Sequence, residues 1–454
     1  MEKSVLRHTA LWVFLVIGLL LLVGRLPQLT WHGHILRRVD LLADVHPLPS
    51  VVCDSDTLPP PPRPAFVDTC RTGMTCIEDY GDSTLRGMTL FYRALDDLAR
   101  RPRTVRIAYF GDSFIEGDIL TADLREQLQC RYGGCGVGFV PVTSLTSGFR
   151  PTVRHSFRGW ESHSAMDSAR FDRTLLGPSG HYFRPLSGAS VELRGQATYA
   201  SRLDTCRRAT VYFRSRGSLR LAIQMNRDSV RTRELPPSGD LRALHVDGRI
   251  GSLRLAVERA DSALFYGLAL DDTCGLALDN FSLRGSSGLT LRSVPVETLR
   301  QFNRLRPYDL VILHYGLNVA SPGVSNYDYY TSGMQTVIRR LKEAFPQAAI
   351  LLVSVPDRDR RAGDGSLQTM PGIRHLVRGQ QRLAADESIA FWNLFEAMGG
   401  EGSMATLVNA RPPMANHDYT HINFRGGRRL AALLYDALVY GKEQYDRRRA
   451  YEME

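Results

Sequence analysis

Four polar residues have the types, and the order along the chain, that nucleophilic catalysis by a serine requires. Ser113 lies in a Gly-Asp-Ser stretch, Asn318 ends a Gly-Leu-Asn stretch, and Asp418 precedes His421 by three positions. A serine hydroxyl is a poor nucleophile until a base takes its proton. His421 is the candidate base, and Asp418 is the candidate residue that holds the imidazole in the right tautomer and stabilises the imidazolium.

The tetrahedral intermediate of such a reaction needs hydrogen-bond donors that point at its oxyanion. The candidates are the backbone N–H of Ser113, the backbone N–H of a glycine and the side-chain amide of Asn318. The loss of one such donor typically costs about a hundredfold to a thousandfold in rate. Each motif alone has an ordinary structural reading, since Gly-Asp-Ser favours turns and Asp-x-x-His caps helices. Their joint order and placement favour the catalytic reading.

The elements expected around these motifs place them at one edge of a sheet. Apolar runs predict strands at 104–110 and 309–314, each directly before a motif, and a helix at 424–441 begins just after His421. In open α/β sheets, ligands bind at the carboxyl ends of the strands. We therefore expect the motifs to meet there.

The chain shows two patterns of predicted secondary structure, one of which interrupts the other. Strands and helices alternate before residue 150 and after residue 284, which predicts an α/β fold with a parallel sheet and helices on both faces. Residues 150–284 consist of short alternating segments separated by Gly, Pro, Asn and Asp. That pattern predicts an all-β sandwich inserted into the α/β domain.

The motifs around Ser113, Asn318 and His421 resemble blocks I, III and V of the SGNH (GDSL-type) hydrolases. The second block of that family is a glycine between the first two motifs, and Gly288 in Ser-Gly-Leu-Thr resembles it, with Gly285 as the other choice. The resemblance implies a flavodoxin-like three-layer parallel sheet, a serine esterase mechanism that requires no metal or cofactor, and Gly288 as an oxyanion donor. The inserted β-rich module resembles the layout of exported peptidoglycan O-acetylesterases, in which that module is carbohydrate-binding-like.

The first residues of the chain predict export. Lys3 and Arg7 precede an apolar run over 11–23 that Arg25 closes, and no small-x-small cleavage site follows it. This is typical of a signal sequence or an uncleaved anchor in the inner membrane, and the missing cleavage site favours the anchor. The expected organisation is a signal anchor over 1–25, an extended proline-rich tether over 26–76, hydrolase segments over 77–149 and 285–445, and the inserted sandwich over 150–284.

The cysteines fit an exported protein located in the periplasm or cell envelope. The spacing predicts three disulfides in an oxidising compartment, leaving Cys53 over. The candidate pairs are Cys70 with Cys76, Cys130 with Cys135, and Cys206 with Cys274.

The formal net charge of +10 comes almost entirely from arginine, since Lys3, Lys342 and Lys442 are the only lysines. Basic residues do not run together with interleaved aromatics, so we expect no nucleic-acid partner. The excess of arginine reflects either coding bias or a mild preference for anionic surfaces such as cell-wall polymers.

The expected activity is the removal of acetyl or other small acyl groups from a cell-envelope glycan through an acyl-serine intermediate. An acyltransferase that passes the acyl group to a sugar hydroxyl uses the same intermediate, and a non-catalytic glycan-binding protein is the third alternative. Three aromatic residues of the inserted module either stack on sugar rings or pack in its core, and the core is the favoured reading: Trp160, Tyr182 and Tyr199.

Overall fold

The computed structural model describes residues 2–23, 30–31, 34–35, 66–81, 87–168 and 171–453. The chain divides into two compact units, Met1–Ala65 and Phe66–Glu454. Cys53 lies outside the described residues.

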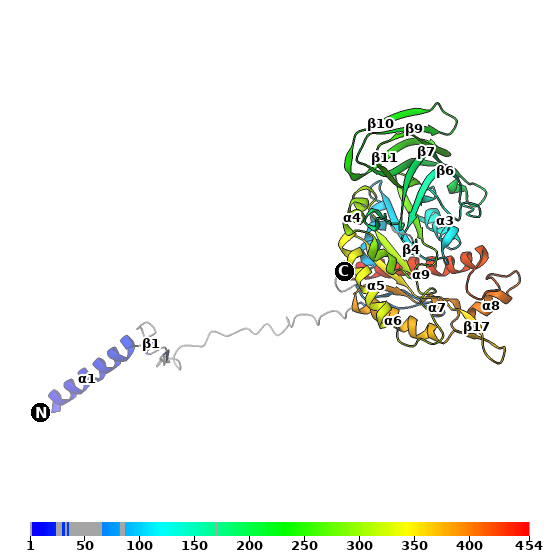
Figure 1. Ribbon diagram of the computed structural model, residues 1–454. Helices are drawn as coiled ribbons and strands as arrows, with labels where there is room; N and C mark the ends of the chain where they lie inside the picture. The colour runs from blue at the N-terminus through cyan, green and yellow to red at the C-terminus, as the bar shows by residue number, and fades with distance from the viewer. Residues whose placement is uncertain are drawn as a thin grey trace. The chain divides into compact units, whose positions relative to one another are not determined.

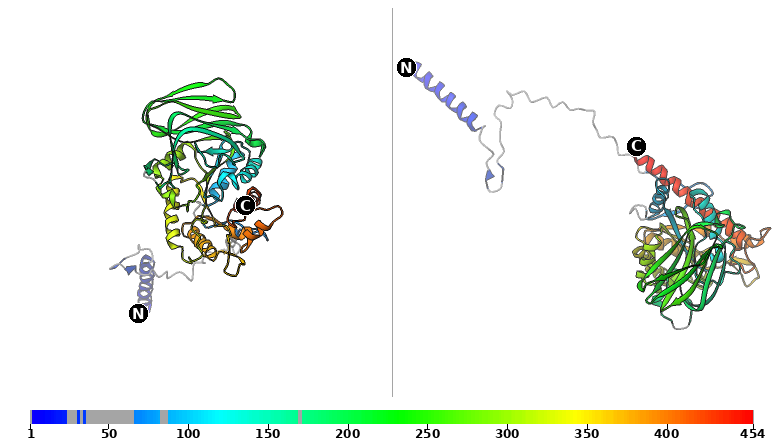
Figure 2. Two further views of the ribbon diagram at one scale, coloured as in Figure 1. Left: turned by 45° about the vertical axis from the view of Figure 1, so that its right-hand side comes forward. Right: turned by 90° about the horizontal axis from the view of Figure 1, so that it is seen from above.

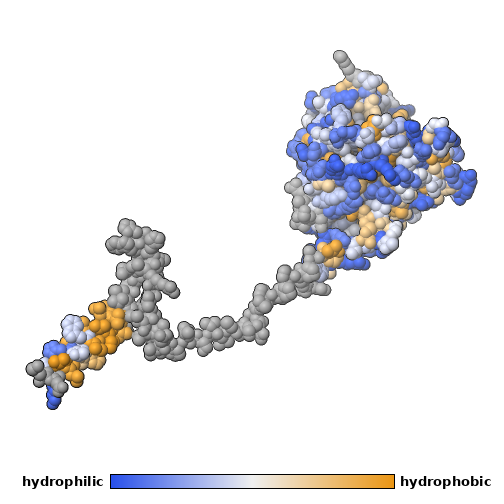
Figure 3. Space-filling view, turned by 90° about the horizontal axis from the view of Figure 1, so that it is seen from below, coloured by the Kyte–Doolittle hydropathy of each residue, from blue (hydrophilic) through white to orange (hydrophobic). Residues whose placement is uncertain are grey.

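The first unit contains one long helix, α1 (Glu2–Val23), and two short paired strands, β1 (Thr30–Trp31) and β2 (His34–Ile35). The stretch Lys3–Leu22 is long and apolar enough to cross a membrane, and none of it is buried inside the protein. Its surface is apolar over most of its length (Figure 3). A signal sequence and a membrane anchor both have these properties, as the sequence predicted.

The second unit is built on a six-stranded sheet in the order β14-β4-β15-β16-β19-β3. The first five strands are parallel and β3 is antiparallel to β19. The strands β15 and β16 are buried throughout, as expected for strands covered on both faces. The bounds are β3 (Glu78–Asp79), β4 (Thr104–Gly111), β14 (Gly275–Ser282), β15 (Leu310–His314), β16 (Ala349–Val353) and β19 (Ala390–Trp392).

The helices of this unit form two groups whose members contact one another: α2, α3, α7 and α9 in one, and α4, α5 and α6 in the other. Their bounds are α2 (Thr89–Leu98), α3 (Thr121–Tyr132), α4 (Val296–Leu305), α5 (Asp328–Ala344), α6 (Gly372–Asp386), α7 (Leu394–Met398), α8 (Ser403–Asn409) and α9 (Phe424–Met453). A small hairpin, β17 (Asp359–Arg361) with β18 (Leu367–Thr369), lies outside the main sheets. The predicted α/β fold with a parallel sheet is confirmed.

The inserted module is antiparallel, and Figures 1 and 2 show it at one end of the unit, beyond the parallel sheet. Its nine strands form one hydrogen-bonded sheet, in which β7 and β13 are joined by the single pair Phe183 and Phe265. Buried side chains from both sides of that junction share one core, as a sandwich requires. The strands are β5 (Gly138–Val140), β6 (Val153–Ser164), β7 (His181–Gly195), β8 (Cys206–Ser215), β9 (Leu219–Met225), β10 (Arg231–Leu235), β11 (Ser238–Ile250), β12 (Ser252–Ala260) and β13 (Ala263–Asp271).

The junctions between the two sheets differ from the expected boundaries. The strand β14 falls within the range expected for the insertion, yet it pairs with β4 in the parallel sheet. Conversely, β5 falls within the first hydrolase segment and pairs with β13 of the insertion. A buried parallel strand and a sandwich strand are both short apolar runs, so periodicity does not separate them.

The aromatic residues of the insertion serve packing. Trp160 stacks edge-on against Phe265, with ring centroids 5.1 Å apart, and Tyr182 is buried. The hydroxyl of Tyr199 donates to Asp123 of α3 at 2.5 Å. The core interpretation is therefore confirmed for Tyr182, whereas Trp160 and Tyr199 are half-buried and pack against the core.

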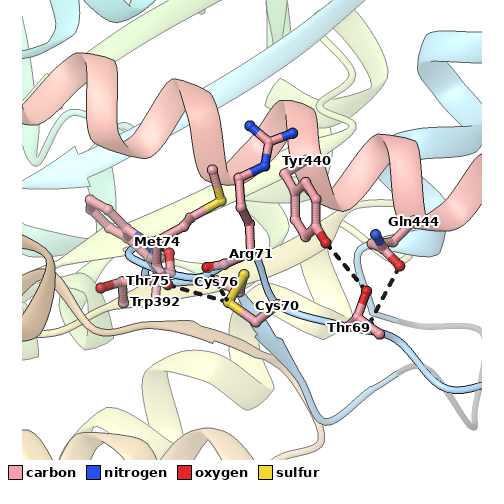
Figure 4. Close-up of a disulfide and its surroundings, with 9 residues drawn as sticks. All are labelled: Thr69, Cys70, Arg71, Met74, Thr75, Cys76, Trp392, Tyr440 and Gln444. Atoms are coloured by element: carbon pink, nitrogen blue, oxygen red, sulfur yellow. Dashed lines mark hydrogen bonds between the residues drawn. A yellow bond between two sulfur atoms is a disulfide. The ribbon is translucent and has the colours of Figure 1, made fainter.

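The folded second unit begins at Phe66, which lies within the tether expected over 26–76. Cys70 and Cys76 form a disulfide, as predicted, and the loop that they close is held between β19 and α9 (Figure 4). The indole of Trp392 donates to the carbonyl of Thr75 at 3.0 Å. Residues 66–76 thus belong to the folded unit.

The other two predicted disulfides are wrong, because all four of their cysteines are free thiols. Cys130 is exposed on α3, where its thiol faces Glu126, whereas Cys135 lies next to Asp272. Cys206 is buried at the start of β8, where its thiol donates to the carbonyl of Arg208. The spacing of these cysteines in the sequence therefore does not predict which groups their thiols contact.

A buried ion cluster joins the parallel sheet to the insertion. The guanidinium of Arg306 contacts Asp271 of β13 at 2.6 Å and Asp279 of β14 at 2.6 Å, and all three side chains are about 1% exposed or less. The phenol of Tyr308 also donates to Asp279 at 2.6 Å. Burial alone works to raise the pKa of Asp279, but the charge and hydrogen bonds of Arg306 lower it below the ordinary value.

We expect Arg306→Met to lower the free energy of unfolding by about 3–5 kcal/mol, because it leaves two carboxylates in the core without their counter-charge. Urea unfolding of the full chain, followed by circular dichroism, measures this. The matched control is Arg300→Met, which removes a solvent-exposed pair between α4 and Glu343 of α5 and costs at most about 1 kcal/mol. Equal losses in the two variants would contradict the role of the cluster.

Candidate active site

The loops that carry the candidate residues leave the same edge of the parallel sheet. At the carboxyl end of β4, Gly111 is in register with His314 of β15 on one side and Ser282 of β14 on the other. Ser113 follows β4, Asn318 follows β15, and the glycine-rich stretch 283–288 follows β14. The motifs therefore meet at the carboxyl ends of the parallel strands, where the sequence predicted them to meet.

The side chains of Ser113, His421 and Asp418 form a continuous hydrogen-bonded chain. The Ser113 Oγ lies 3.1 Å from Nε2 of His421, and Nδ1 of His421 lies 2.7 Å from Oδ2 of Asp418. A carboxylate accepts only, so Nδ1 carries the proton and Nε2 is left to accept from the serine hydroxyl. This tautomer is the one that general-base catalysis by the histidine requires.

The loop before α9 holds the imidazole in place. The Oδ1 atom of Asp418 accepts the backbone N–H groups of Thr420 at 2.9 Å and His421 at 3.0 Å. The N–H of Asn416 donates to the carbonyl of His421, and Asn423 caps α9 by accepting the N–H of Arg425 at 2.9 Å. The start of α9 and the position of His421 are therefore set by the same short turn.

Asp418 stays ionised. Partial burial works to raise its pKa, but the hydrogen bonds that it accepts from the backbone and ring of His421 and from Thr420 outweigh burial and lower the pKa. The Asp418 side chain is 47% exposed and that of His421 is 38% exposed. A substrate can therefore reach the pair from solvent.

The candidate oxyanion donors are gathered around Ser286. The N–H of Gly288 donates to Oγ of Ser286 at 3.0 Å, and the amide of Asn318 donates to the Ser286 carbonyl at 3.0 Å. Gly288 has φ +88°, and a Cβ there would lie 2.8 Å from the Tyr315 ring, so this position requires glycine. No described residue accepts the N–H of Ser113.

These bonds also distinguish the two candidate glycines. Gly288 is linked through Ser286 to Asn318, whereas Gly285 is exposed and lies beside Met166 of the inserted module. For the described residues, no hydrogen bond connects Gly285 to this group. The geometry thus favours Gly288 as the donor that accompanies Asn318.

Asp112 is a site residue to which sequence reasoning assigned no role of its own. It is 1% exposed, and its two oxygens accept the N–H of Phe114 at 2.9 Å and the Asn318 amide at 3.0 Å. Burial raises the pKa of Asp112 to about 6, and the bond from Phe114, the charge of His421 and the Asn318 amide oppose that rise. The Asp112 carboxylate orients the Asn318 amide, and only its place between two motif residues hinted at this.

A second buried cluster supports the segment that follows Ser113. Asp118 contacts Arg125 of α3 at 3.2 Å and Arg150 at 2.8 Å, and it accepts from Asn280 of β14 at 3.0 Å. Burial works to raise the pKa of Asp118, but the two arginines lower it well below the ordinary value. The turn between β4 and α3 is thereby tied both to the sheet and to the start of the insertion.

We expect Asn318→Ala to lower kcat for an ester substrate by about a hundredfold to a thousandfold while KM changes little, because an oxyanion donor acts mainly in the transition state. Steady-state hydrolysis of p-nitrophenyl acetate measures both constants. Asn326→Ala is the matched control, since its exposed amide bonds only to Asp328 and should leave both constants unchanged. A loss that appears only in KM would argue against an oxyanion role.

The raised pKa of Asp112 predicts a pH-dependent stability. The folded chain binds this proton more tightly than the unfolded chain, whose pKa is near 3.8. The corresponding stability is complete below about pH 4 and is lost as the pH rises through about 6. Asp112→Asn cannot ionise, so its free energy of unfolding relative to wild type should increase from about pH 4 to about pH 7.5 by on the order of 2–3 kcal/mol. Urea titrations that found the same difference at both pH values would contradict this.

Comparisons with known proteins agree with this architecture. Residues 255–428 match the model of the GDSL-like lipase/acylhydrolase family. A solved structure described as a peptidoglycan O-acetylesterase in action is 22% identical, with a TM-score of 0.67 over 81% of this chain and 99% of that chain. No curated protein matches the chain.

Two further structures are more distant. An acetyl xylan esterase is 18% identical with a TM-score of 0.27, over 36% of this chain and 81% of that chain. A salicylyl-acyltransferase from a tetracycline biosynthetic pathway is 14% identical with a TM-score of 0.27, over 63% of this chain and 97% of that chain. Residues 255–428 thus resemble the GDSL-like lipase/acylhydrolase family, and the second unit has the SGNH hydrolase fold seen in the peptidoglycan O-acetylesterase structure.

Proposed function

We propose that this protein is an exported, membrane-anchored esterase that removes O-acetyl or other small acyl groups from a cell-envelope glycan such as peptidoglycan. The observation that carries the proposal is the hydrogen-bonded chain of Ser113, His421 and Asp418, with its distances of 3.1 and 2.7 Å. A non-catalytic binding protein on this fold has no need to keep all three groups in this geometry.

In the first half of the reaction, Oγ of Ser113 attacks the carbonyl carbon of the ester while Nε2 of His421 takes the hydroxyl proton. The oxyanion that forms accepts hydrogen bonds from the Ser113 N–H, the Gly288 N–H and the Asn318 amide. The last two donors exchange their bonds to Ser286 and Asp112 for the oxyanion. When the intermediate collapses, the C–O bond to the sugar breaks and His421 returns the proton to the sugar oxygen.

In the second half, a water molecule replaces the sugar. His421 takes a proton from the water, the hydroxide attacks the acyl carbon, and the bond to Ser113 breaks as the serine oxygen regains a proton. The free acid leaves. Asp418 keeps its negative charge throughout and stabilises the imidazolium in both halves.

Three features support a polymeric substrate outside the cytoplasm. The likeness to the peptidoglycan O-acetylesterase covers 81% of this chain. Because the two hydrolase segments are shorter than that, the matched region includes much of the inserted module. The helix α1 is long and apolar enough to anchor the chain in a membrane. The disulfide between Cys70 and Cys76 suits an oxidising compartment.

We expect Ser113→Ala and His421→Ala each to lower the release of acetate by about ten-thousandfold or more, both from p-nitrophenyl acetate and from O-acetylated peptidoglycan. His417→Ala is the matched control, because it removes an exposed imidazole next to Asp418 and should leave the rates unchanged.

The outcomes separate the competing functions. An inactive wild-type chain, or a Ser113→Ala variant as active as wild type, would reject the hydrolase mechanism. Activity on p-nitrophenyl acetate without release of acetate from the glycan would reject the proposed substrate. Acetyl groups found on an added acceptor sugar, in place of free acetate, would identify an acyltransferase.

A further inference from the structure

The inserted module contains a cavity apart from Ser113 and its partners. Its volume is about 660 Å³, which lies in the range of small-molecule sites. The walls come from the loop between β6 and β7, from β7, and from the neighbouring ends of β8 and β13. The lining is predominantly polar and includes Arg184, Arg214 and Arg216, with Asp172 as its one carboxylate.

No described carboxylate forms an ion pair with these three arginines, although other arginines of the module do have such partners. Elsewhere in the module, Arg208 contacts Asp247 at 2.6 Å and Arg220 contacts Glu258 at 3.0 Å. The carboxylates nearest the cavity have other partners. Glu161, opposite Arg184 across the strands, contacts His163, and Asp261, next to Ser262 of the cavity wall, contacts Arg259.

Arg214 is built into the wall. Its Nη2 donates to Gln301 of α4 at 3.3 Å, which fixes the side chain, while its Nε is buried and has no acceptor. The position of the Arg214 guanidinium is therefore set by α4 and not by a counter-charge.

Asp172 does not neutralise the cavity. Two hydrogen bonds from Thr174 occupy its Oδ1 atom, and they, together with the charges of Arg184 and Arg216, lower its pKa. With three guanidinium groups and one carboxylate, the lining keeps an excess of positive charge. Planar guanidinium groups bind carboxylates through paired hydrogen bonds.

The wall of the cavity is connected to the candidate active site. Asp172 and Thr174 lie between Ala165 and Gly180, and the Ala165 N–H donates to the Gly180 carbonyl at 2.8 Å. The methyl group of Met166 in this loop would contact a Cβ on Gly285 at 3.5 Å. Gly285 precedes Ser286, so Met166 links the inserted module to the stretch that contains the candidate oxyanion donors.

We propose that this cavity is a second polymer-binding site, in which Arg184, Arg214 and Arg216 bind carboxylate groups of the glycan whose ester is cleaved at Ser113. The inference rests on the proposed function for the identity of the polymer. Peptidoglycan carries such carboxylates on its peptide stems. The site holds the polymer beside the triad but takes no part in the chemical step.

The test is sedimentation of the full chain, in detergent micelles, with peptidoglycan sacculi, in a Ser113→Ala background so that the polymer is not altered. Arg184→Gln with Arg216→Gln removes two exposed charges of the site. The matched control is Arg231→Gln with Arg233→Gln, which removes two exposed arginines of β10 outside the cavity. A second arm uses sacculi whose carboxylates have been converted to amides, and thermal unfolding checks that each variant is folded.

We expect the dissociation constant for native sacculi to rise at least about tenfold in the Arg184/Arg216 variant, because a charged hydrogen bond contributes about a factor of ten or more. The control should change less than about twofold, and amidated sacculi should bind weakly to every variant. Equal binding by the two double variants, undiminished binding to amidated sacculi, or no binding of the background chain to native sacculi would each overturn the proposal.

Failure of the proposed function gives a different result. If the chain with Ser113 intact releases no acyl group from peptidoglycan, while binding still depends on the arginines and on the carboxylates, the substrate assignment fails and the binding site stands.

Discussion

The hydrogen bond between Ser113 and His421 joins residues 308 positions apart. It depends on how the strands and helices of the second unit are packed. It forms because β4 is an inner strand whose carboxyl end opens beside those of β14 and β15, and because the turn before α9 reaches the same edge. The helix α9 contacts α2, α3 and α7, so the position of the base depends on helices from both ends of this unit. A shift in any of these elements would move the nitrogen away from the hydroxyl.

On the opposite side of Ser113, polar groups are held in the core at a cost to stability. Asp112 is buried with a raised pKa, and its bond to Asn318 places an amide where an oxyanion donor is needed. Ser286 bonds to both Gly288 and Asn318, so the two donors are oriented relative to one another before a substrate arrives. In the proposed reaction these candidate donors stay in place and change only their hydrogen-bond acceptors when the oxyanion forms.

Much of the fold could be predicted from local pattern. The strands expected at 104–110 and 309–314 correspond closely to β4 and β15, and the helix expected at 424–441 forms the first part of α9. The assignment of β14 to the insertion failed, because an apolar strand has the same appearance in either sheet. Two of the three predicted cysteine pairs were wrong for a similar reason. Cys70 and Cys76 are six positions apart in a loop that closes, whereas Cys130 and Cys135 are turned to different partners by the end of α3.

The sequence by itself determined which residue types were available for chemistry and on which strand ends they lie, because side-chain chemistry and hydrophobic periodicity are local properties. It was therefore enough to select Ser113, Asn318, Asp418 and His421 as candidates. Only the tertiary structure decided that Asp112 and Ser286 bond to the oxyanion donors, that Arg306 ties the two sheets together, and that three arginines share one cavity. These contacts join residues from separate elements, and no local pattern records which side chains long-range packing brings within hydrogen-bond distance.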